Sequence, residues 1–494
     1  MPFLIEHLTE VVFVLFVMVL LGNLFLVGIV LTRRQRRRKF FQRIDALREK
    51  YGSIVPGVLS GQIPYVQGLQ ELRGISGSDR MSMLERLCLE RKPAPGQEPV
   101  LRRLSEDLGL VKIWQQRLMG QIDPASIKDA LADPGGLVER VSTLQFLIRA
   151  KSAENLGLIR HEPSWPLLVK ALEDSHPDLQ SVAARSLSAI GYPGSFPALV
   201  AQLHKVVLAS TSALSVRAIK AALVSFPLEN ADEFLPSLRH PNPRIRFLST
   251  DIIREMVERE AAGKTDFCLD RRNLQADLAE VFLVEMAFDE NPDVRARAAA
   301  VISYLADPRA VPLLLTLLED AAWFVRLHAV RALAKRRFLS QAGKIAGALT
   351  DPNWRVREAA VRTLRSFGPV GRERLTEHFL RTDDRYSREQ IADEFQRAGL
   401  IPDLLLQCAE NGNGREARVL GHLAEMGKTS YIVSVLTQGK GNGRLRKKFL
   451  QEFGGSPDPQ IQHWIEMVAQ QEPDSELRAL AQAALSANHQ HGEG

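Results

Sequence analysis

The chain has 494 residues and a formal net charge of +6, and the way that charge is distributed restricts its partners. Residues 33–44 hold seven basic residues and no acidic one, so removing their charge leaves −1 for the rest. This balance excludes the basic excess on which nucleic-acid backbone binding usually depends. The three cysteines, Cys88, Cys268 and Cys408, lie far apart without a C-x-x-C pair, which predicts neither a disulfide framework nor a zinc site.

An uncharged segment near the N-terminus predicts a transmembrane helix. Residues 11–31 contain no charged side chain and one amide, Asn23. A helix of this length spans roughly 30 Å, the thickness of a bilayer core. A cleaved signal peptide carries basic residues before its apolar run, whereas residues 1–10 contain Glu6, Glu10 and no Lys or Arg. We therefore expect an uncleaved anchor at 11–31 after a short extracytoplasmic N-terminus at 1–10.

The next segment, residues 32–50, is expected to be a basic juxtamembrane helix. Its basic residues before Asp45 are Arg33, Arg34, Arg36, Arg37, Arg38, Lys39 and Arg43. Because basic flanks stay in the cytoplasm, we expect a single-pass protein of the cell inner membrane with its N-terminus outside and the remaining chain cytoplasmic. Such clusters also contact anionic lipid head groups, and a role in topology alone is an open alternative.

Residues 51–139 are expected to form an irregular helical capping region. Helical stretches at 80–91, 99–119 and 125–131 are separated by segments rich in Pro and Gly. End units of a repeat array must present a polar outer face, so an atypical sequence is expected there. A flexible tether at residues 93–96 is the alternative interpretation.

A 31-residue repeat follows. The motifs DENPDVRA, DAAWFVRL and DPNWRVRE begin at Asp289, Asp320 and Asp351 and carry Arg295, Arg326 and Arg357. An apolar residue comes seven positions after each arginine, at Ile302, Leu333 and Leu364. Weaker copies extend the pattern to about ten units over residues 140–486, before a tail at 487–494 that we expect to be disordered. A fixed period of this length indicates stacked structural units rather than one globular core.

Each unit is predicted to be a pair of helices. In residues 294–305 the apolar positions lie on one face at helical spacing, and a second apolar helix begins near Pro312 after the break ADPRA. No alternation typical of strands competes with this pattern. The expected fold class is therefore all-α: an α-solenoid of about ten helical hairpins after one N-terminal transmembrane helix.

The motif Asp…Pro-Asp-Val-Arg-x-x-Ala-Ala resembles that of HEAT repeats. The 31-residue period resembles the short bacterial HEAT-like form that is also found in phycobilin lyases. This resemblance covers roughly residues 140–486 and implies the fold, while one fold of this kind serves many functions. A HEAT-like iron enzyme, deoxyhypusine hydroxylase, uses several His-Glu dyads, whereas His161-Glu162 is the only one in this sequence.

The recurring arginines have two interpretations. They can form an exposed row for acidic partners, or a ladder in which each arginine pairs with an aspartate of its own or the next repeat. We favour the ladder, because the guanidinium makes forked hydrogen bonds to carboxylates and turn carbonyls. Gln180 occupies the arginine position in one copy, so that unit does without the charge.

Two features are candidates for partner binding. Trp323 and Trp354 are 31 residues apart, so they should be spatial neighbours, and tryptophan is common at interface hot spots. An 18-residue excess between two repeat arginines predicts a longer helix or an extra loop at residues 257–275, which contains Lys264, Arg271 and Arg272. Packing of the tryptophans between repeats and an idle insertion are the alternatives.

These observations favour a non-catalytic function. We expect a membrane-anchored HEAT-repeat scaffold that binds one or more membrane-associated proteins at the cytoplasmic face. No cofactor, metal or nucleic acid is expected, and anionic lipid head groups are possible additional partners. The alternatives are a tetrapyrrole-handling protein similar to phycobilin lyases and a regulator that binds anionic lipid through residues 33–43.

Overall fold

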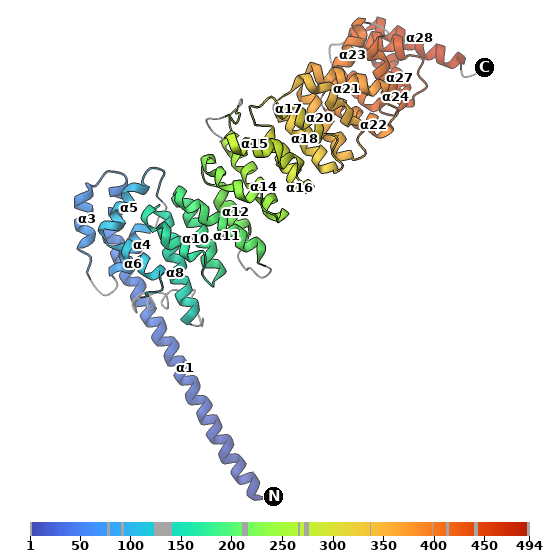
Figure 1. The fold of residues 1–494 in the computed structure, drawn as a ribbon. Coiled ribbons are helices and arrows are strands. Elements are labelled where there is room, and N and C mark those ends of the chain that lie inside the picture. Colours follow the sequence, from blue (N-terminus) through green and yellow to red (C-terminus); the bar gives the residue numbers. More distant parts are fainter. Residues whose placement is uncertain are drawn as a thin grey trace. The chain divides into compact units, whose positions relative to one another are not determined.

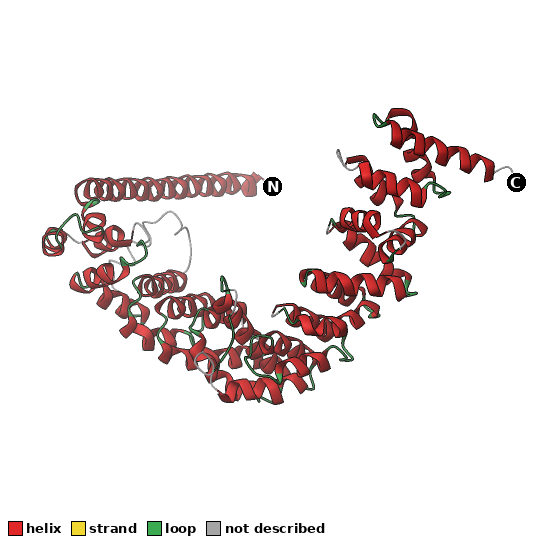
Figure 2. Ribbon diagram, turned by 90° about the horizontal axis from the view of Figure 1, so that it is seen from above, coloured by secondary structure: helices red, strands yellow, loops and turns green. Residues whose placement is uncertain are grey.

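The structure is a computed structural model with two compact units, Met1–Pro236 (unit 1) and Ser237–Gly494 (unit 2), described separately below. It describes residues 2–76, 80–89, 93–122, 141–209, 216–264, 267–270, 276–335, 337–397, 399–411, 414–438 and 443–491. Within these ranges the regular elements are helices, apart from one isolated bridge between Leu269 and Leu305. The predicted all-α fold class is therefore confirmed (Figure 2).

Unit 1 consists of a long N-terminal helix followed by stacked shorter helices (Figure 1). Its helices are α1 (Pro2–Tyr51), α2 (Ile54–Leu59), α3 (Tyr65–Arg73), α4 (Arg80–Leu89), α5 (Glu98–Asp107), α6 (Leu110–Leu118), α8 (Val141–Leu158), η1 (Glu162–Ser164), α9 (Trp165–Ala171), α10 (Pro177–Ile190), η2 (Pro193–Ser195), α11 (Phe196–Leu208), α12 (Val216–Val224) and η3 (Leu228–Phe234). A short helix, α13 (Leu235–Leu238), lies where the two units join in sequence.

Helix α1 is continuous from the predicted anchor through the basic segment. Its stretch Val12–Thr32 has 21 residues, a mean hydropathy of 2.9 and no burial against the protein, so it is long and apolar enough to cross a membrane. Length and composition are the basis of that statement, and a signal sequence has the same properties. The apolar side chains along this stretch are exposed, with Phe13 at 67% and Phe25 at 70%.

The capping region packs directly on the first repeat helix of unit 1. Arg117 on α6 donates to the Glu85 carboxylate on α4 at 2.8 Å, and the Asn155 amide on α8 donates to the same carboxylate at 2.6 Å. Arg117 and Asn155 are both buried. Since a partly buried carboxylate gains from such partners, this network ties α4, α6 and α8 to one another. The predicted helix at 125–131 lies outside the described residues.

Unit 2 is a series of helix pairs (Figure 1). Its helices are α14 (Pro243–Ala261), α15 (Ala276–Val284), η4 (Met286–Phe288), α16 (Pro292–Ile302), α17 (Ala310–Leu317), α18 (Trp323–Lys335), η5 (Leu339–Gln341), α19 (Ala342–Gly347), η6 (Ala348–Thr350), α20 (Trp354–Ser366), α21 (Pro369–Arg381), α22 (Arg385–Arg397), α23 (Leu400–Asn411), α24 (Arg415–Glu425), α25 (Thr429–Gln438), α26 (Gly443–Phe453), α27 (Pro459–Gln471) and α28 (Ser475–His491). The last of these ends five residues into the segment 487–494, which was expected to be disordered.

The helices that carry the repeat arginines stack on one another as one layer in unit 2. Helix α16 packs between α14 and α18, and α20 packs between α18 and α22, while α17, α19 and α21 pack against this layer. The apolar residues seven positions after Arg295, Arg326 and Arg357 are Ile302, Leu333 and Leu364, and all three are fully inaccessible. Their burial in successive units produces a continuous core, as expected for stacked repeats.

Side-chain caps start several of these helices at the same repeat position. The side-chain oxygens of Asn242, Asn291 and Asn353 accept hydrogen bonds from the backbone amides two residues later. Proline follows at the first helical position in two of the three helices, where its missing N–H costs nothing. The residues between the repeat aspartate and the repeat arginine therefore determine where the helix begins.

Candidate functional site

The repeat arginines form a ladder between adjacent units. Arg295 donates through Nε and Nη2 to the two carboxylate oxygens of Asp320 at 2.7 and 2.9 Å, and Arg326 binds Asp351 in the same way at 2.6 and 2.9 Å. Each aspartate belongs to the next repeat. The remaining nitrogen, Nη1, donates to the carbonyl oxygen of the aspartate in the same repeat, at 2.7 Å for Arg295 and Asp289. The ladder interpretation is confirmed for these arginines.

Electrostatics at the ladder follow from this geometry. Hydrogen bonds to Asp320 raise the pKa of Arg295 despite partial burial. Burial alone would raise the pKa of Asp320, but hydrogen bonds from Arg295 and from the Ala322 amide outweigh it and hold that pKa below its usual range. Both members of the pair are therefore charged at neutral pH. Their charges are used inside the protein and are not available to a partner.

The ladder continues where the sequence pattern weakens. In unit 1, Arg149 donates to the Asp174 carboxylate at 2.5 Å, and Gln180 donates to the Asp174 carbonyl oxygen at 2.5 Å. Gln180 therefore keeps the backbone hydrogen bond that Nη1 makes elsewhere. In unit 2, Thr382 occupies the aspartate position of the repeat after Arg357, and Arg357 donates to the Gln390 amide oxygen at 3.2 Å instead.

The two predicted tryptophans both contact one arginine. The Arg355 guanidinium is 5.4 Å from the ring centroid of Trp323 and 5.4 Å from that of Trp354, which is 53% exposed. Trp323 is half-buried and makes an edge contact with Phe324 at 5.7 Å. A guanidinium on an aromatic face gains cation–π attraction while its N–H groups stay free to donate at the rim.

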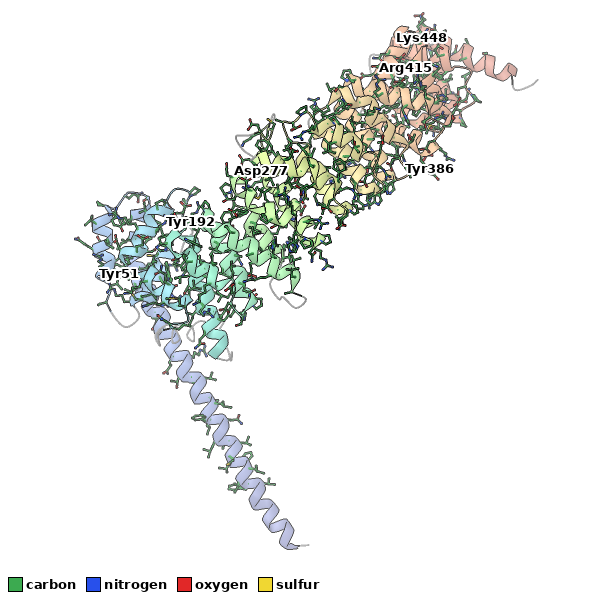
Figure 3. The ribbon with its side chains drawn as sticks, in the orientation of Figure 1. Tyr51, Tyr192, Asp277, Tyr386, Arg415 and Lys448 are labelled. Atoms are coloured by element: carbon green, nitrogen blue, oxygen red, sulfur yellow. The ribbon has the colours of Figure 1, made fainter. Side chains whose placement is uncertain are left out.

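Sequence reasoning missed a fifth member of this group. Tyr386 is 68% exposed at the start of α22, and its ring lies 5.9 Å from the Arg357 guanidinium. Figure 3 labels Tyr386 at the surface of unit 2. The 31-residue repeat could have identified it, since Tyr386 follows Arg355 by 31 residues and therefore occupies the same repeat position. We call Trp323, Phe324, Trp354, Arg355 and Tyr386 the aromatic edge, which spans the N-terminal ends of α18, α20 and α22.

The exposed side of the arginine helices next to this edge is rich in charge. Arg297 lies 2.8 Å from the Asp251 carboxylate, and its Nη1 is 3.2 Å from the His328 Nε2. Lys335 donates to the Glu258 carboxylate at 2.6 Å. Burial, together with the cations Arg297, Arg331, Arg254 and Lys335, lowers the pKa of His328 to about 4. The ring of His328 is therefore neutral at neutral pH.

The predicted insertion is partly a longer helix and partly a packed segment. Helix α14 runs to Ala261, and beyond it Leu269 is buried and exchanges backbone hydrogen bonds with Tyr304 and Ala306 at 2.7 and 2.9 Å. Lys264 donates to Glu260 at 2.6 Å and lies 5.2 Å from the Phe267 ring centroid. Its ammonium is therefore engaged within the insertion. The candidates Arg271 and Arg272 lie outside the described residues.

The basic juxtamembrane cluster lies on α1. Arg34 and Arg38 are exposed. For Arg33, Arg36, Arg37, Lys39 and Arg43 the structure describes the helix but not the side chains. Their role stays a prediction.

Metal or thiol chemistry finds no support in the part of the chain that the structure describes. It contains no group of three or more His, Cys, Asp or Glu side chains that could hold a metal ion. Cys88 is buried, which raises the pKa of its thiol to about 12, and Cys268 is half-exposed. The His161 ring contacts the Ser164 hydroxyl at 2.7 Å and the Glu106 carboxylate at 3.5 Å, which accounts for both ring nitrogens.

Comparison with known families identifies the repeats. A HEAT repeats model matches residues 136–220 and 280–344, and a HEAT repeat model matches residues 344–371. These segments match HEAT repeats, in agreement with the resemblance of their sequence motif. No curated protein sequence matches the chain.

Three solved structures illustrate the similarity in fold, and all three have low sequence identity to this chain. An engineered protein is 16% identical over 76% of this chain and 98% of its own, with a TM-score of 0.29. Importin beta is 10% identical over 92% of this chain and 70% of its own, with a TM-score of 0.34. A chain in the structure of Kap121p bound to Nup53p is 13% identical over 88% of this chain and 52% of its own, with a TM-score of 0.37. At these scores the likenesses do not bear on what this chain binds.

Proposed function

We propose that this chain is a non-catalytic HEAT-repeat scaffold that binds another protein through the aromatic edge while α1 holds it at a membrane. The observation that carries the proposal is the exposed Trp354, whose ring contacts the Arg355 guanidinium together with the ring of Trp323. Trp, Tyr and Arg dominate interface hot spots, because they offer large contact areas together with oriented hydrogen-bond donors. An exposed group of this composition is the strongest binding feature of the described surface.

The ladder supports this role by keeping the edge rigid. Trp323 and Trp354 start helices α18 and α20, and Arg326, three residues after the first tryptophan, is bound to Asp351, three residues before the second. The distance between the two rings is therefore fixed by a bidentate ion pair. A surface that is already ordered loses less conformational entropy on binding, which favours affinity.

The anchor would raise the effective concentration of the scaffold for membrane partners. The exposed apolar stretch Val12–Thr32 supports a single membrane crossing. The basic residues that follow it favour an inner-membrane protein with the N-terminus outside and the repeats at the cytoplasmic face, in contact with anionic head groups. The partner that fits this arrangement is itself membrane-associated, so that both proteins diffuse in one plane.

Photo-crosslinking in the native membrane tests the proposal. The photoreactive amino acid p-benzoylphenylalanine would replace Trp354, Trp323 or, as a control, Leu339, an exposed apolar residue in η5. We expect one protein to be cross-linked from both tryptophan positions and not from Leu339. Cross-links only to lipid or to a second copy of the chain, from both tryptophan positions, would contradict the proposed protein-binding role.

A further inference from the structure

The aromatic edge continues into a charged face on α18 and α20. On α18, Phe324, His328, Arg331 and Lys335 are spaced by four, three and four residues, so they lie along one side of the helix. On α20, Arg355 and Arg362 are seven residues apart and share one side in the same way. Helices α18 and α20 pack against each other, and Phe324 and Arg331 are each 31 residues before Arg355 and Arg362, so we infer that the two rows run side by side. We call these six residues the basic face.

Most cations near this face are neutralised by partners within the protein. Lys335 pairs with Glu258, and Arg362 pairs with Glu358 at 2.7 Å. Arg331 and Arg355 differ, because both are exposed and neither makes an ion pair with the described residues. These two guanidiniums are therefore the ones that can accept an external anion without breaking an internal contact.

The cations nearest His328 are mostly balanced by acidic side chains. Burial and the cations Arg297, Arg331, Arg254 and Lys335 lower the pKa of His328. Arg297 and Arg254 pair with Asp251, and Lys335 pairs with Glu258. Arg331 is the member of this group without an ion pair among the described residues, so a carboxylate placed near it would meet a positive potential.

We propose that the basic face recognises an acidic, extended segment of a partner protein, with carboxylates on Arg331 and Arg355 and an apolar side chain against Trp354. This inference rests on the proposed function and specifies the chemistry of the partner. Guanidiniums bind carboxylates in a forked geometry, and opposite charges at an interface supply specificity and speed of association. A protein segment is favoured over a phosphate polymer, because two unpaired arginines, of which Arg355 contacts the tryptophans, do not form the extended basic track that such a polymer requires.

The geometry also sets a spacing for the segment. The Trp323 ring contacts Arg355, and Arg331 comes eight residues after Trp323 on α18, so the two arginines are separated by about 12 Å along the helix. An extended chain covers this length in about four residues. The segment should therefore carry acidic residues both next to its apolar anchor and about four positions away from it.

A defined peptide tests the inference on the full-length protein in detergent. The probe is a fluorescein-labelled 12-residue peptide with one central Phe, Glu beside it and Glu four positions away, and its counterpart carries Lys in place of every Glu. We expect the Glu peptide alone to bind, with a fluorescence anisotropy change that weakens at high salt. The double variant Arg331→Gln/Arg355→Gln should bind about tenfold or more weakly, as expected for loss of charge pairs at an interface.

Arg418→Gln is the matched control, since Arg418 is an exposed arginine on α24 without an ion pair among the described residues, and the substitution removes the same charge. It should leave affinity for the Glu peptide unchanged, and circular dichroism should show that all variants stay folded. Equal binding of the Lys peptide, an unchanged double variant, or tighter binding to a single-stranded oligonucleotide or to phosphatidylserine vesicles would overturn the inference.

The two proposals can fail separately. A protein cross-linked from Trp354 whose capture does not change in Arg331→Gln/Arg355→Gln would overturn the acidic partner and keep the scaffold. Absence of any protein cross-link from the tryptophan positions would overturn the scaffold itself.

Discussion

A ladder arginine makes two kinds of contact, one with a carboxylate of the next repeat and one with a backbone carbonyl of its own repeat. At one position of the chain, Gln180, only the second contact is made. Arg326 binds the Asp351 carboxylate of the next repeat and the Asp320 carbonyl of its own. Gln180 donates to the equivalent carbonyl oxygen, that of Asp174, but it has no guanidinium to bind a carboxylate of the next repeat. The carbonyl bond holds the turn within one unit, whereas the carboxylate bond joins two units. Replacing arginine by glutamine therefore separates the two contributions.

Arg326→Gln is expected to lower the free energy of unfolding by about 2–4 kcal/mol, because it leaves the largely buried Asp351 charge without its cation. Arg326→Gln/Asp351→Asn should recover part of this loss, since no unpaired charge remains. Urea unfolding followed by tryptophan fluorescence measures both. Arg309→Gln, which breaks exposed pairs with Glu280 and Asp307, serves as the control and should lower the free energy of unfolding far less. A loss for Arg326→Gln as small as that of the control would contradict a structural role for the ladder.

His328 makes the stability of unit 2 depend on pH. Its pKa is about 4 in the folded protein, against about 6.5 in an unfolded chain. Between these values the unfolded chain binds a proton that the folded chain does not, so the free energy of unfolding falls as the pH decreases. We expect the contribution of His328 to fall by about 2 kcal/mol from pH 7 to pH 5. In His328→Gln this part of the pH dependence should be absent from urea unfolding curves. Identical pH dependence in both proteins would refute the assignment.

At the scale of helices, close packing depends on a few small residues. Gly371 on α21 lies against α20 so closely that a Cβ atom there would be 1.7 Å from the Leu364 carbonyl oxygen. Gly343 on α19 has no atom within 4 Å of the same position. One glycine is therefore required by contact between helices, and the other only adds flexibility to the unfolded chain.

We expect Gly371→Ala to lower the free energy of unfolding by about 2–3 kcal/mol, because the backbone of α20 must move to admit the methyl group. Gly343→Ala should raise it by about 0.5–1 kcal/mol through the lower entropy of the unfolded chain. Thermal unfolding of the two variants and of the wild type measures these differences in the free energy of unfolding. Destabilisation of similar size in both would mean that the contact at Gly371 does not limit the packing.

The 31-residue repeat predicted the helices and their buried positions better than it predicted the residues of the exposed aromatic edge. The spacing from Arg295 to Ile302 reports burial on one helix face, which is a local property, so the core position and the ladder followed from the sequence. Tyr386 was missed because an aromatic residue replaces Arg355 at that repeat position, and comparing residues of one type does not reveal it. The packing of Leu269 against Tyr304 joins segments 35 residues apart through backbone hydrogen bonds that no side-chain pattern encodes.

At the scale of the whole molecule, charge is separated by region. The seven basic residues of the segment 33–44 follow the apolar stretch directly, while the remainder of the chain carries −1. A repeat array with so little net charge has weak attraction of its own for an anionic bilayer. Membrane attachment is therefore expected to depend on α1 and not on the repeats.

Removal of residues 1–32 should move the protein from the membrane fraction to the soluble fraction, whereas replacement of the seven basic residues by Gln should leave it membrane-bound. The apolar stretch supplies the insertion energy, and the basic residues bias only its direction. A reporter fused to the C-terminus, active only in the cytoplasm, should be fully active in the wild type and lose activity in the Gln variant as part of the population inverts. Membrane release at pH 11 of the intact chain would show instead that α1 does not cross the bilayer. A wild-type reporter active only outside the cytoplasm would reverse the proposed orientation, and with it the cytoplasmic placement of the aromatic edge.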